Sequence, residues 1–466
     1  MHVNMSPYHG KPDFSRLDAA AGGDIDLISV ADILRNSVVF APHSTLVDVK
    51  QLPVGFAPQE TFDRAPEFKF DFRHEGQSSA FRGEEHDWVG TYHRLLCEAT
   101  ARATADMASP WLLQSGGKDS TTLAIALADS RPDTTCITYL GGTEENEVAS
   151  ATHVARTLGL RHEQLVCDPA RAYDRYLAVV DRMPLLSADF ALLSYVDLAT
   201  EIASMGGDGV IDGVGSDNYF GTPVKLQQRI LFWLARGIRL PPFVFDLPLV
   251  RGNFKLCYAL STLQMRAVER VFPGSRFSDQ EVDELFGRPV ASESRDRLSI
   301  FESELASASS LDEWRDISLS IAAATGGFAK GIYTANAMGL KVAFPFCDRQ
   351  FREWVYDHVP RNKKVDPVTK VSKILVREHI AKHFGDLPYV SRKGSFRFNL
   401  CGLAQQRFDQ VHAFAQQASD VLPGAAGWLE RNRGQLDNKF HASRFYLLAI
   451  VLPWIAEHSR PEAANA

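Results

Sequence analysis

This chain of 466 residues has no long hydrophobic run, no excess of positive charge and few cysteines. Each of these features excludes a class of protein. No apolar stretch approaches the length of a membrane span, and the opening residues Met1-His2-Val3-Asn4 do not make a signal peptide. The net charge of −7 gives no electrostatic reason to expect nucleic acid or an anionic membrane as a partner. We therefore expect a cytoplasmic protein that binds neither.

The six cysteines, at positions 97, 136, 167, 257, 347 and 401, are scattered and form no Cys-x-x-Cys pair. Most lie inside apolar patterns, which favours reduced, buried thiols. The rest of the composition is typical of a soluble globular protein, with 45% hydrophobic and 23% charged residues. The length allows about two to three domain-sized units with ample core.

One stretch organises the rest of the chain, Gln114-Ser-Gly-Gly-Lys-Asp-Ser-Thr-Thr122. It follows the apolar run 111–113 and opens a helical pattern. A strand, a glycine-rich turn and a helix form an anion-binding arrangement, because the glycines let the backbone approach a phosphate and unpaired amides at the helix start face it. The side chains suit that use: Gly116 and Gly117 allow the approach, Ser115, Ser120 and Thr121 are hydroxyl donors, and Asp119 can hold magnesium.

The spacing of this loop matches neither the Walker pattern nor the dinucleotide-binding pattern. It resembles the Ser-Gly-Gly-x-Asp-Ser loop of the ATP pyrophosphatases, enzymes that split ATP between its α and β phosphates and activate a carboxyl or carbonyl group as an adenylate. A glycine pair after a strand is also compatible with a simple turn. The serines and the aspartate favour the nucleotide.

Strands and helices alternate on both sides of this loop. We expect strands at 111–114, 134–140, 162–167 and 209–212, separated by helical patterns. The alternation predicts an α/β fold with a parallel sheet, flanking helices and ligands at the carboxyl ends of the strands. The last of these strands enters a second glycine-rich turn, residues 213–218, so both turns are expected to face one site.

The remaining patterns are mostly helical. An amphipathic helix at 25–34, a strand at 45–52 and a helix at 86–107 are expected before the loop. Further helices are expected at 225–239, 257–271, 279–286, 299–306 and 311–324, with a final helical block at 402–456.

Four stretches, in register over residues 110 to about 400, resemble the synthetase half of the asparagine synthetase family, which includes β-lactam synthetases and lasso-peptide macrolactam cyclases. The first is the loop 115–120. The second, Tyr139-Leu-Gly-Gly-Thr-Glu-Glu-Asn-Glu147, is similar to the family strand that meets the adenine. The third is Asp212-Gly-Val-Gly-Ser-Asp217, and the fourth is Leu340-Lys-Val-Ala-Phe-Pro-Phe-Cys-Asp348 with the lysine-containing stretches 373–377 and 387–393 after it.

The resemblance implies an ATP- and magnesium-dependent enzyme and assigns roles to individual residues. Asp119 and Asp217 are expected to hold magnesium against the triphosphate. Lys373 and Lys393 correspond to the family lysines that bind pyrophosphate and stabilise charge on the reacting acyl centre, and they are the expected catalytic residues. The expected ATP site comprises Ser115, Gly116, Gly117, Asp119, Ser120, Tyr139, Gly213 and Gly215.

Other polar residues in these stretches are better explained by structure. Asp348 is expected to fix a turn or cap a helix, and His162 to be a hydrogen-bonded residue of its strand. For Asp217 the structural alternative is an aspartate turn before a helix, and for Lys393 it is a solvated surface lysine.

Two departures from the family bear on the source of the amine. Cys97 is the first cysteine, so the catalytic cysteine of the family's glutaminase domain has no counterpart, and residues 29–55 resemble only the last helix and strand of that domain. Val214 stands where asparagine synthetases carry glutamate and β-lactam synthetases carry tyrosine, and a valine cannot relay a proton. Tyr219 and Tyr333 are more typical of packing residues than of a replacement base.

A third departure concerns the organisation of the chain. Residues 222–310 form a helical insertion longer than the family linker, and it could act as a lid that excludes water from an adenylate. The expected segments are a flexible arm at 1–24, a truncated α+β remnant of the glutaminase domain at 25–85, the ATP-binding core at 86–221, the insertion at 222–310 and a helical remainder at 311–466.

These observations predict a ligase that adenylates a carboxylate of a small-molecule or peptide substrate and joins it to an amine, with release of AMP and pyrophosphate. An amine on the same substrate would give a lactam, in natural-product (antibiotic) biosynthesis by analogy with the family. The alternatives are a separate amine or ammonia delivered by a partner and, from another class, a non-catalytic ATP-binding scaffold. The sequence leaves open the substrate, the ring size, the base and the oligomeric state.

Overall fold

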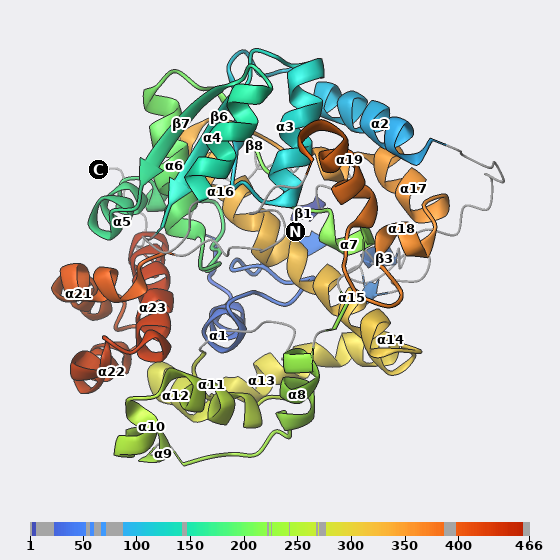
Figure 1. The fold of residues 1–466 in the computed structure, drawn as a ribbon. Coiled ribbons are helices and arrows are strands. Elements are labelled where there is room, and N and C mark those ends of the chain that lie inside the picture. Colours follow the sequence, from blue (N-terminus) through green and yellow to red (C-terminus); the bar gives the residue numbers. More distant parts are fainter. Residues whose placement is uncertain are drawn as a thin grey trace.

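The computed structural model describes residues 2–5, 23–52, 56–59, 67–70, 87–141, 147–220, 223–224, 226–241, 243–266, 269, 276–385 and 398–459. Figure 1 shows a central sheet wrapped by helices, with a further group of helices packed below it. None of the helices in the described part of the chain combines the length and the apolar character that a membrane span requires.

Five parallel strands form the central sheet, in the order β7-β6-β5-β8-β9. They are β5 (Pro110–Leu113), β6 (Thr135–Leu140), β7 (Arg161–Val166), β8 (Gly209–Ile211) and β9 (Lys341–Ala343). The predicted α/β fold with a parallel sheet and flanking helices is confirmed, and the first four strands lie where the sequence predicts them. β9 was not predicted as a strand, because three residues carry too little pattern to be recognised.

The direction in which the chain adds strands reverses at β5. Trp111 of β5 is in register with Thr135 of β6 on one side and with Val210 of β8 on the other. Ligands of open parallel sheets bind at such a reversal, beyond the carboxyl ends of the two strands. The two glycine-rich turns follow β5 and β8, so the topology brings them together.

Helices cover both faces of the sheet. Leu112, Cys136 and Ile211 pack into a core that includes α2 (Trp88–Ala103) and α3 (Lys118–Ser130). Residues that point the opposite way, among them Trp111 and Val210, pack against α6 (Leu192–Ser204). This burial of both faces explains why the inner strands β5 and β8 are apolar throughout, whereas the edge strand β7 also has polar residues.

A second core joins the amino-terminal helix α1 (Leu27–Asn36) to the carboxyl-terminal helices. These are α21 (Leu400–Gln417), α22 (Ala425–Asn432) and α23 (Lys439–His458). In α23 every residue from Phe440 to Ala456 is buried, so this helix is apolar all round instead of amphipathic. Asp26 caps the start of α1 by accepting from the backbone amides of Ile28 and Ser29.

The predicted insertion is helical, as expected. It contains α8 (Leu226–Leu234), α9 (Phe243–Asp246), α10 (Pro248–Arg251), α11 (Phe254–Leu263), α12 (Asp279–Phe286), α13 (Ala291–Asp296) and α14 (Glu302–Ala306). It packs on α1 and on the carboxyl-terminal helices: the Phe277 amide donates to Leu34, and the Gly424 amide donates to Leu285. Its role as a lid stays a prediction.

The other helices are α4 (Glu147–Thr157), α5 (Pro169–Leu177), α7 (Asp217–Phe220), α15 (Leu311–Ala322), α16 (Ala329–Met338), α17 (Arg349–Asp357), α18 (Arg361–Lys364) and α19 (Ile374–Phe384), with a π-helical turn at Ala323–Phe328. The helices predicted at 225–239 and 257–271 end earlier than expected, at Leu234 and Leu263. The prediction at 402–456 resolves into three helices.

The amino-terminal prediction is corrected in part. Residues 2–5 form β1 (His2–Met5), which pairs in parallel with β2 (Val49–Leu52), so these four residues are not a loose arm. The predicted strand at 45–52 is shorter than expected. β3 (Phe56–Gln59) and β4 (Glu67–Phe70) form an antiparallel pair. Residues 1 and 6–22 of the predicted arm lie outside the described residues.

Candidate active site

The turn after β5 leads directly into the first turn of α3. Gly116 has φ +68°, a left-handed conformation that glycine adopts without strain. Gly117 precedes α3, and no side chain caps the first amides of that helix. The Ser115 and Ser120 hydroxyl oxygens lie 3.1 Å apart, and the Ser120 hydroxyl donates to the Gly117 carbonyl at 3.2 Å. The predicted glycine-rich turn therefore lies at a helix start, an arrangement that is suited to an anion.

The turn after β8 lies directly against α3. A Cβ placed on Gly213 would be 3.5 Å from the Asp119 Cβ, so the two turns are in van der Waals contact. Gly215 has φ +121°, which again requires glycine. The structure thus brings Gly213 and Gly215 to the same place as the first loop.

Lys373 joins the two turns. Its Nζ donates to Asp119 Oδ1 at 2.6 Å, to the Ser216 hydroxyl at 2.7 Å and to Asp217 Oδ1 at 2.8 Å. The Ser216 hydroxyl in turn donates to Asp119 Oδ1 at 2.9 Å. We call these four residues the lysine cluster. Three predicted site residues, from three distant parts of the sequence, therefore meet at the strand-order reversal.

Burial is uneven within the lysine cluster. The Lys373 side chain is 3% exposed, whereas the Asp119 and Asp217 side chains are 24% and 46% exposed. Burial alone lowers the pKa of Lys373, but the carboxylates of Asp119 and Asp217 outweigh it, so the pKa lies above its ordinary value of 10.5. The lysine is held charged, and the carboxylates keep oxygen atoms open to solvent.

The backbone at Lys373 is shaped to deliver this side chain. Lys373 has φ +60°, and it lies at the start of α19 without a side-chain cap. A left-handed conformation costs a residue with a Cβ on the order of 1 kcal/mol or more, and such strain is concentrated at functional sites. The contacts of the ammonium group hold this conformation in place.

The other predicted ATP and catalytic residues differ in how the structure places them. Tyr139 lies near the carboxyl end of β6 and is 7% exposed, packed in a core cluster with Leu165 and Tyr195. Residues 142–146, which follow it, lie outside the described residues. So does Lys393, together with the rest of 386–397. The site roles of Tyr139 and Lys393 stay predictions.

The residues expected to be structural behave as expected. Asp348 caps α17 by accepting from the Phe351 amide at 3.0 Å, and it also accepts two hydrogen bonds from Arg102. Both ring nitrogens of His162 are hydrogen-bonded, to Thr138 and Thr152. Tyr219 and Tyr333 are buried, and their hydroxyls bond to the Phe346 carbonyl and to Gln51.

Sequence reasoning missed a charged group beside Val214. The Lys330 ammonium donates to the Gly327 carbonyl at 2.8 Å and lies 3.8 Å from Asp189 Oδ2. Burial raises the pKa of Asp212, and Lys330 opposes that shift. A Cβ on Gly327 would lie 3.3 Å from Val214 Cγ1, which places this group next to the departure from the family pattern. No spacing in the sequence signals it.

Gln114 is a further candidate that the sequence did not single out. It is 1% exposed at the end of β5, and its amide oxygen and nitrogen have no hydrogen-bond partner among the described residues. A buried amide without partners costs about 1–3 kcal/mol, which makes it a ready contact for a ligand. A polar residue ending an apolar strand was the available signal.

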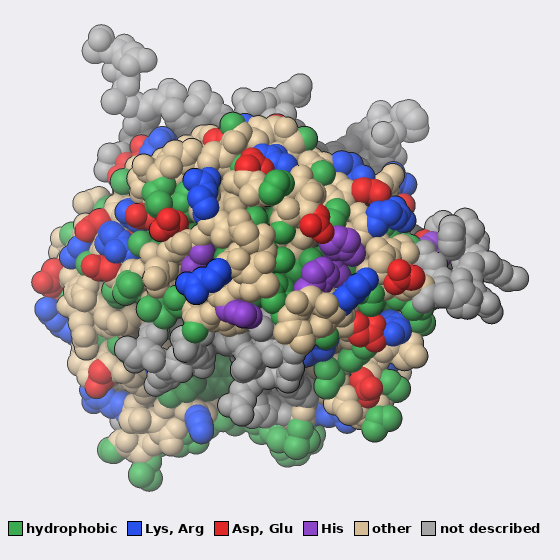
Figure 2. Space-filling view, turned by 45° about the horizontal axis from the view of Figure 1, so that its top comes forward, with side chains coloured by type: hydrophobic (Ala, Val, Ile, Leu, Met, Phe, Trp, Pro, Cys, Tyr) green, Lys and Arg blue, Asp and Glu red, His purple; other side chains and the backbone are tan. Residues whose placement is uncertain are grey.

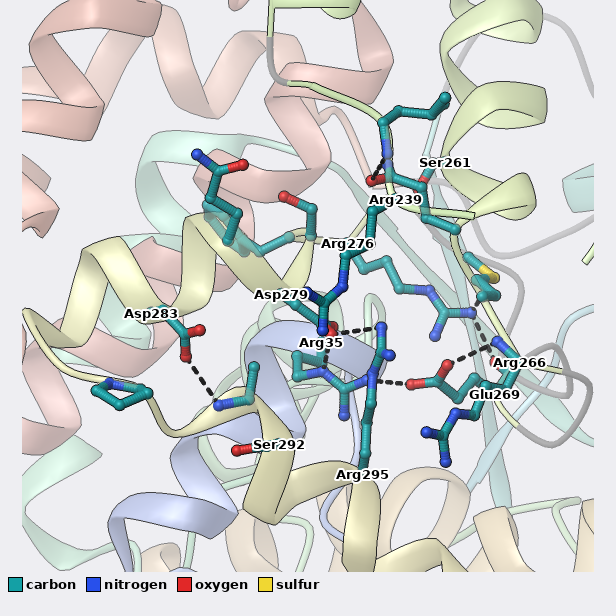
Figure 3. A pocket seen from close by; sticks show the side chains of 18 of the residues that line it. Arg35, Arg239, Ser261, Arg266, Glu269, Arg276, Asp279, Asp283, Ser292 and Arg295 are labelled. Atoms are coloured by element: carbon teal, nitrogen blue, oxygen red, sulfur yellow. Dashed lines mark hydrogen bonds and ion pairs between the residues drawn. The ribbon is translucent and has the colours of Figure 1, made fainter. Parts of the chain in front are cut away.

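A separate cavity of about 570 Å³ lies between α1 and the insertion (Figure 3). Five arginines and four acidic residues line it, and none belongs to the glycine-rich turns. We call five of these residues the arginine cluster: Arg35, Arg276, Arg295, Glu269 and Asp279. Arg35 bonds to Glu269 and Asp279, and Arg295 pairs with Asp279, so the charges largely neutralise one another.

The described geometry is suited to binding a polyphosphate. Amides and hydroxyls of the first turn can hold phosphate oxygens, the Lys373 ammonium adds positive charge, and the exposed carboxylates can take a divalent cation. The remaining functional question is which reaction these groups serve.

Comparison with known families answers it in outline. Residues 91–420 match the asparagine synthase family model, and this stretch contains the whole central sheet and the lysine cluster. A search of curated proteins found no match. Enzymes of the family use ATP, and typically magnesium, to form amides. The match extends over most of the chain, which therefore belongs to the asparagine synthase family and is an ATP-dependent amide-forming ligase of that family's synthetase type.

Proposed function

We propose that this ligase adenylates a carboxylate of its substrate and then joins the activated carbon to an amine of the same molecule, forming a lactam. The lysine cluster, at the strand-order reversal between two glycine-rich turns, is the observation that carries the proposal. Its cation and paired acids suit a reaction in which pyrophosphate leaves.

The proposed reaction has two steps, adenylation of the carboxylate and formation of the amide. A substrate carboxylate oxygen attacks the α-phosphorus of ATP, the bond to the bridging oxygen breaks, and pyrophosphate leaves. The amine nitrogen then attacks the acyl carbon, the bond from that carbon to the AMP oxygen breaks, and the amine loses a proton. The substrate loses one water in total, and ATP becomes AMP and pyrophosphate.

Each residue of the site has a role in this scheme. The Ser115–Ser120 loop binds the phosphates, and Lys373 stabilises the charge that develops on the departing pyrophosphate. Asp119 and Asp217 fit magnesium, because both carboxylates keep exposed oxygens, the hard ligands that this ion prefers. Bound there, magnesium would neutralise part of the triphosphate charge. Lys393 acts on the acyl centre.

The amine is assigned to the substrate for two reasons. The family match lies over the synthetase part, and no glutaminase domain is detected in the chain. The group around Asp212, Asp189 and Lys330 supplies both signs of charge beside Val214, which suits a substrate that has both an amine and a carboxylate. Binding both reacting groups together supplies most of the acceleration.

The first experiment is mass spectrometry of an ammonia-free reaction with ATP, magnesium and the metabolite pool of the producing cell. AMP together with a metabolite that has lost one water is the expected result. AMP that forms only after ammonia or another amine is added would replace the lactam with an intermolecular amide. No AMP under any condition would leave a non-catalytic ATP-binding scaffold.

Substitutions then locate the chemistry. Asp119→Ala and Asp217→Ala should abolish AMP formation, while Asp420→Ala, an exposed control, should not. Lys393→Ala should impair acyl transfer but keep nucleotide binding, and unchanged turnover in that variant would refute its role.

A further inference from the structure

Three histidines meet on the face formed by α2, α3 and α19, outside the lysine cluster. They are His93 of α2 and His379 and His383 of α19, and we call them the histidine cluster. One ring nitrogen from each lies within 4.8 Å of those from the other two. Figure 2 shows histidine side chains gathered on this side of the molecule. His379 is buried, whereas His383 is exposed.

Hydrogen bonds to other groups fix one nitrogen of each ring. His93 Nε2 lies 3.0 Å from Asp129 Oδ2, and His383 Nδ1 lies 2.9 Å from the carbonyl oxygen of His379. A carboxylate and a carbonyl can only accept, so both nitrogens carry the proton. His379 Nδ1 lies 2.7 Å from the Thr122 hydroxyl, which donates to Tyr92, so His379 Nδ1 is a donor too.

These assignments leave three lone pairs, on Nδ1 of His93, Nε2 of His379 and Nε2 of His383. The first two nitrogens face each other at 2.9 Å. Two lone pairs at this distance repel unless a proton or a metal ion lies between them. Metal-binding histidines typically donate their second ring N–H to a carboxylate, a carbonyl or a similar acceptor, and all three rings have such a partner here.

We propose that the histidine cluster is a binding site for a divalent transition-metal ion of the zinc type, with three imidazole ligands and a fourth position open to solvent. Three imidazoles suit zinc, copper or nickel rather than magnesium. In a tetrahedral site with metal–nitrogen bonds of about 2.0–2.1 Å, ligand nitrogens are about 3.3 Å apart, so small side-chain rotations complete the geometry. The exposed His383 provides the path of entry.

Cys97 offers an alternative set with His93 and Asp129, since its sulfur lies 3.5 Å from His93 Nε2. One observation disfavours this set: His93 Nε2, which this set would use, already donates to Asp129.

The position of the site gives metal binding a consequence for the ligase. Thr122, the partner of His379, lies one helical turn after Asp119 on α3, and α19 begins immediately after Lys373. An ion held by α2 and α19 therefore fixes the helix that follows Lys373, and the hydrogen bond between His379 and Thr122 links it to α3, which carries Asp119. The proposal itself does not depend on the reaction that these residues serve.

The test is metal binding by the full chain without an affinity tag, after removal of bound metal by a chelator. Zinc titration against a chromophoric chelator should give one site per chain, and cobalt should give the visible absorption of a tetrahedral ion. His383→Gln should weaken zinc binding at least about 100-fold, since even loss of a ligand's hydrogen-bond partner costs 10–100-fold. His412→Gln, a histidine paired with Glu430 elsewhere, should leave binding unchanged.

Thermal unfolding gives a second measurement. Zinc should raise the melting temperature of the wild type, His412→Gln and Cys97→Ser, but not of His383→Gln. Absence of stoichiometric zinc binding in the wild type would overturn the proposal. It would also be overturned if Cys97→Ser lost the site while His383→Gln retained it.

Discussion

The lysine cluster and the arginine cluster are both built around buried cations, yet they differ in what surrounds the charge. In the arginine cluster the Glu269 side chain is 2% exposed, and both carboxylate oxygens of Asp279, which is 21% exposed, bond to arginines. In the lysine cluster the cation is equally buried, Asp119 is 24% exposed and Asp217 is 46% exposed. The two clusters therefore differ most at Asp217, the most exposed of these four acids.

The hydrogen bonds of the arginines show the same difference. Arg35 also donates to Ser294 at 2.7 Å, and Arg276 donates to Asn36 and to the Glu269 carbonyl, each at 2.6 Å. These bonds fasten α1 to the insertion. A charge cluster whose acceptors are enclosed stabilises the fold, and one whose acceptors reach solvent can bind a ligand. Activity and stability should therefore respond oppositely to mutations in the two clusters.

The largest expected effect is on activity in the lysine cluster. Lys373→Met removes the ammonium group but keeps the length of the side chain, and it should lower AMP formation about 10²–10³-fold, because one charge-stabilising donor is lost. Its melting temperature should change little, since the exposed carboxylates can be solvated. Lys370→Met is the matched control, because Lys370 is exposed and also has a positive φ, +58°. An equal loss of AMP formation in Lys373→Met and Lys370→Met would contradict the role assigned to the lysine cluster.

The arginine cluster should show the reverse. Arg35→Met removes the buried guanidinium that bonds to both Glu269 and Asp279. Loss of this ion pair should lower the free energy of unfolding by about 3–5 kcal/mol. Turnover of the folded fraction at low temperature should stay within about twofold of the wild type. Urea unfolding and AMP formation measure the two quantities. The control is Arg288→Met, an exposed arginine of the same insertion. A loss of turnover without a loss of stability would contradict the structural role.

A smaller effect is expected for the hydroxyl group of the lysine cluster. Ser216→Ala removes one neutral hydroxyl but leaves Lys373 between its two carboxylates. AMP formation should fall about tenfold or less, as expected from a net hydrogen-bond contribution of about 0.5–1.5 kcal/mol. Ser204→Ala, which removes an exposed hydroxyl, serves as control. A loss as large as that of Lys373→Met would mean that Ser216 has a direct part in the reaction.

The smallest effect concerns pH. Burial alone would raise the pKa of Glu269, but Arg35 and Arg276 outweigh it and hold the pKa below the ordinary value of 4.5. The stabilisation that Glu269 gives is therefore present above pH 4.5 and is lost as the pH falls through its folded pKa. The difference in unfolding free energy between wild type and Glu269→Gln should narrow below pH 4.5, by at most about 1.4 kcal/mol per pH unit. A constant difference would show that Glu269 is not ionised in the folded protein.

The sequence predicts the two glycine-rich turns and their positions because local signals are strong there. Apolar strands that end in glycine-rich turns identify both loops and their meeting at the carboxyl edge of the sheet. Lys373 is different: only the family resemblance pointed to it, since a lysine 254 positions from Asp119 has no local signal of its contact. The pairing of β1 with β2 was missed for the same reason, because it depends on a distant partner, and β9 was missed because three residues carry too little pattern.

The histidine cluster and the arginine cluster could not be predicted from pattern alone. His93 and His379 are 286 positions apart, and Arg35 and Glu269 are 234 apart. A partial signal existed, since His379 and His383 are spaced by one helical turn, as are His93 and Cys97. Spacing of this kind aligns side chains on one helix but says nothing about which other helix will face them.

The position of β5 and β8 within the sheet has a consequence for amide hydrogen exchange. Each has a hydrogen-bonded neighbour on both sides, and Leu112 and Ile211 are fully buried. Their amides should exchange only when the whole domain unfolds, whereas amides of α19, on the surface of the core, should exchange through smaller openings. The loop that we propose to bind phosphate therefore follows a strand in the slowest-exchanging part of the molecule, whereas Lys373 lies at the start of a helix that should open more readily.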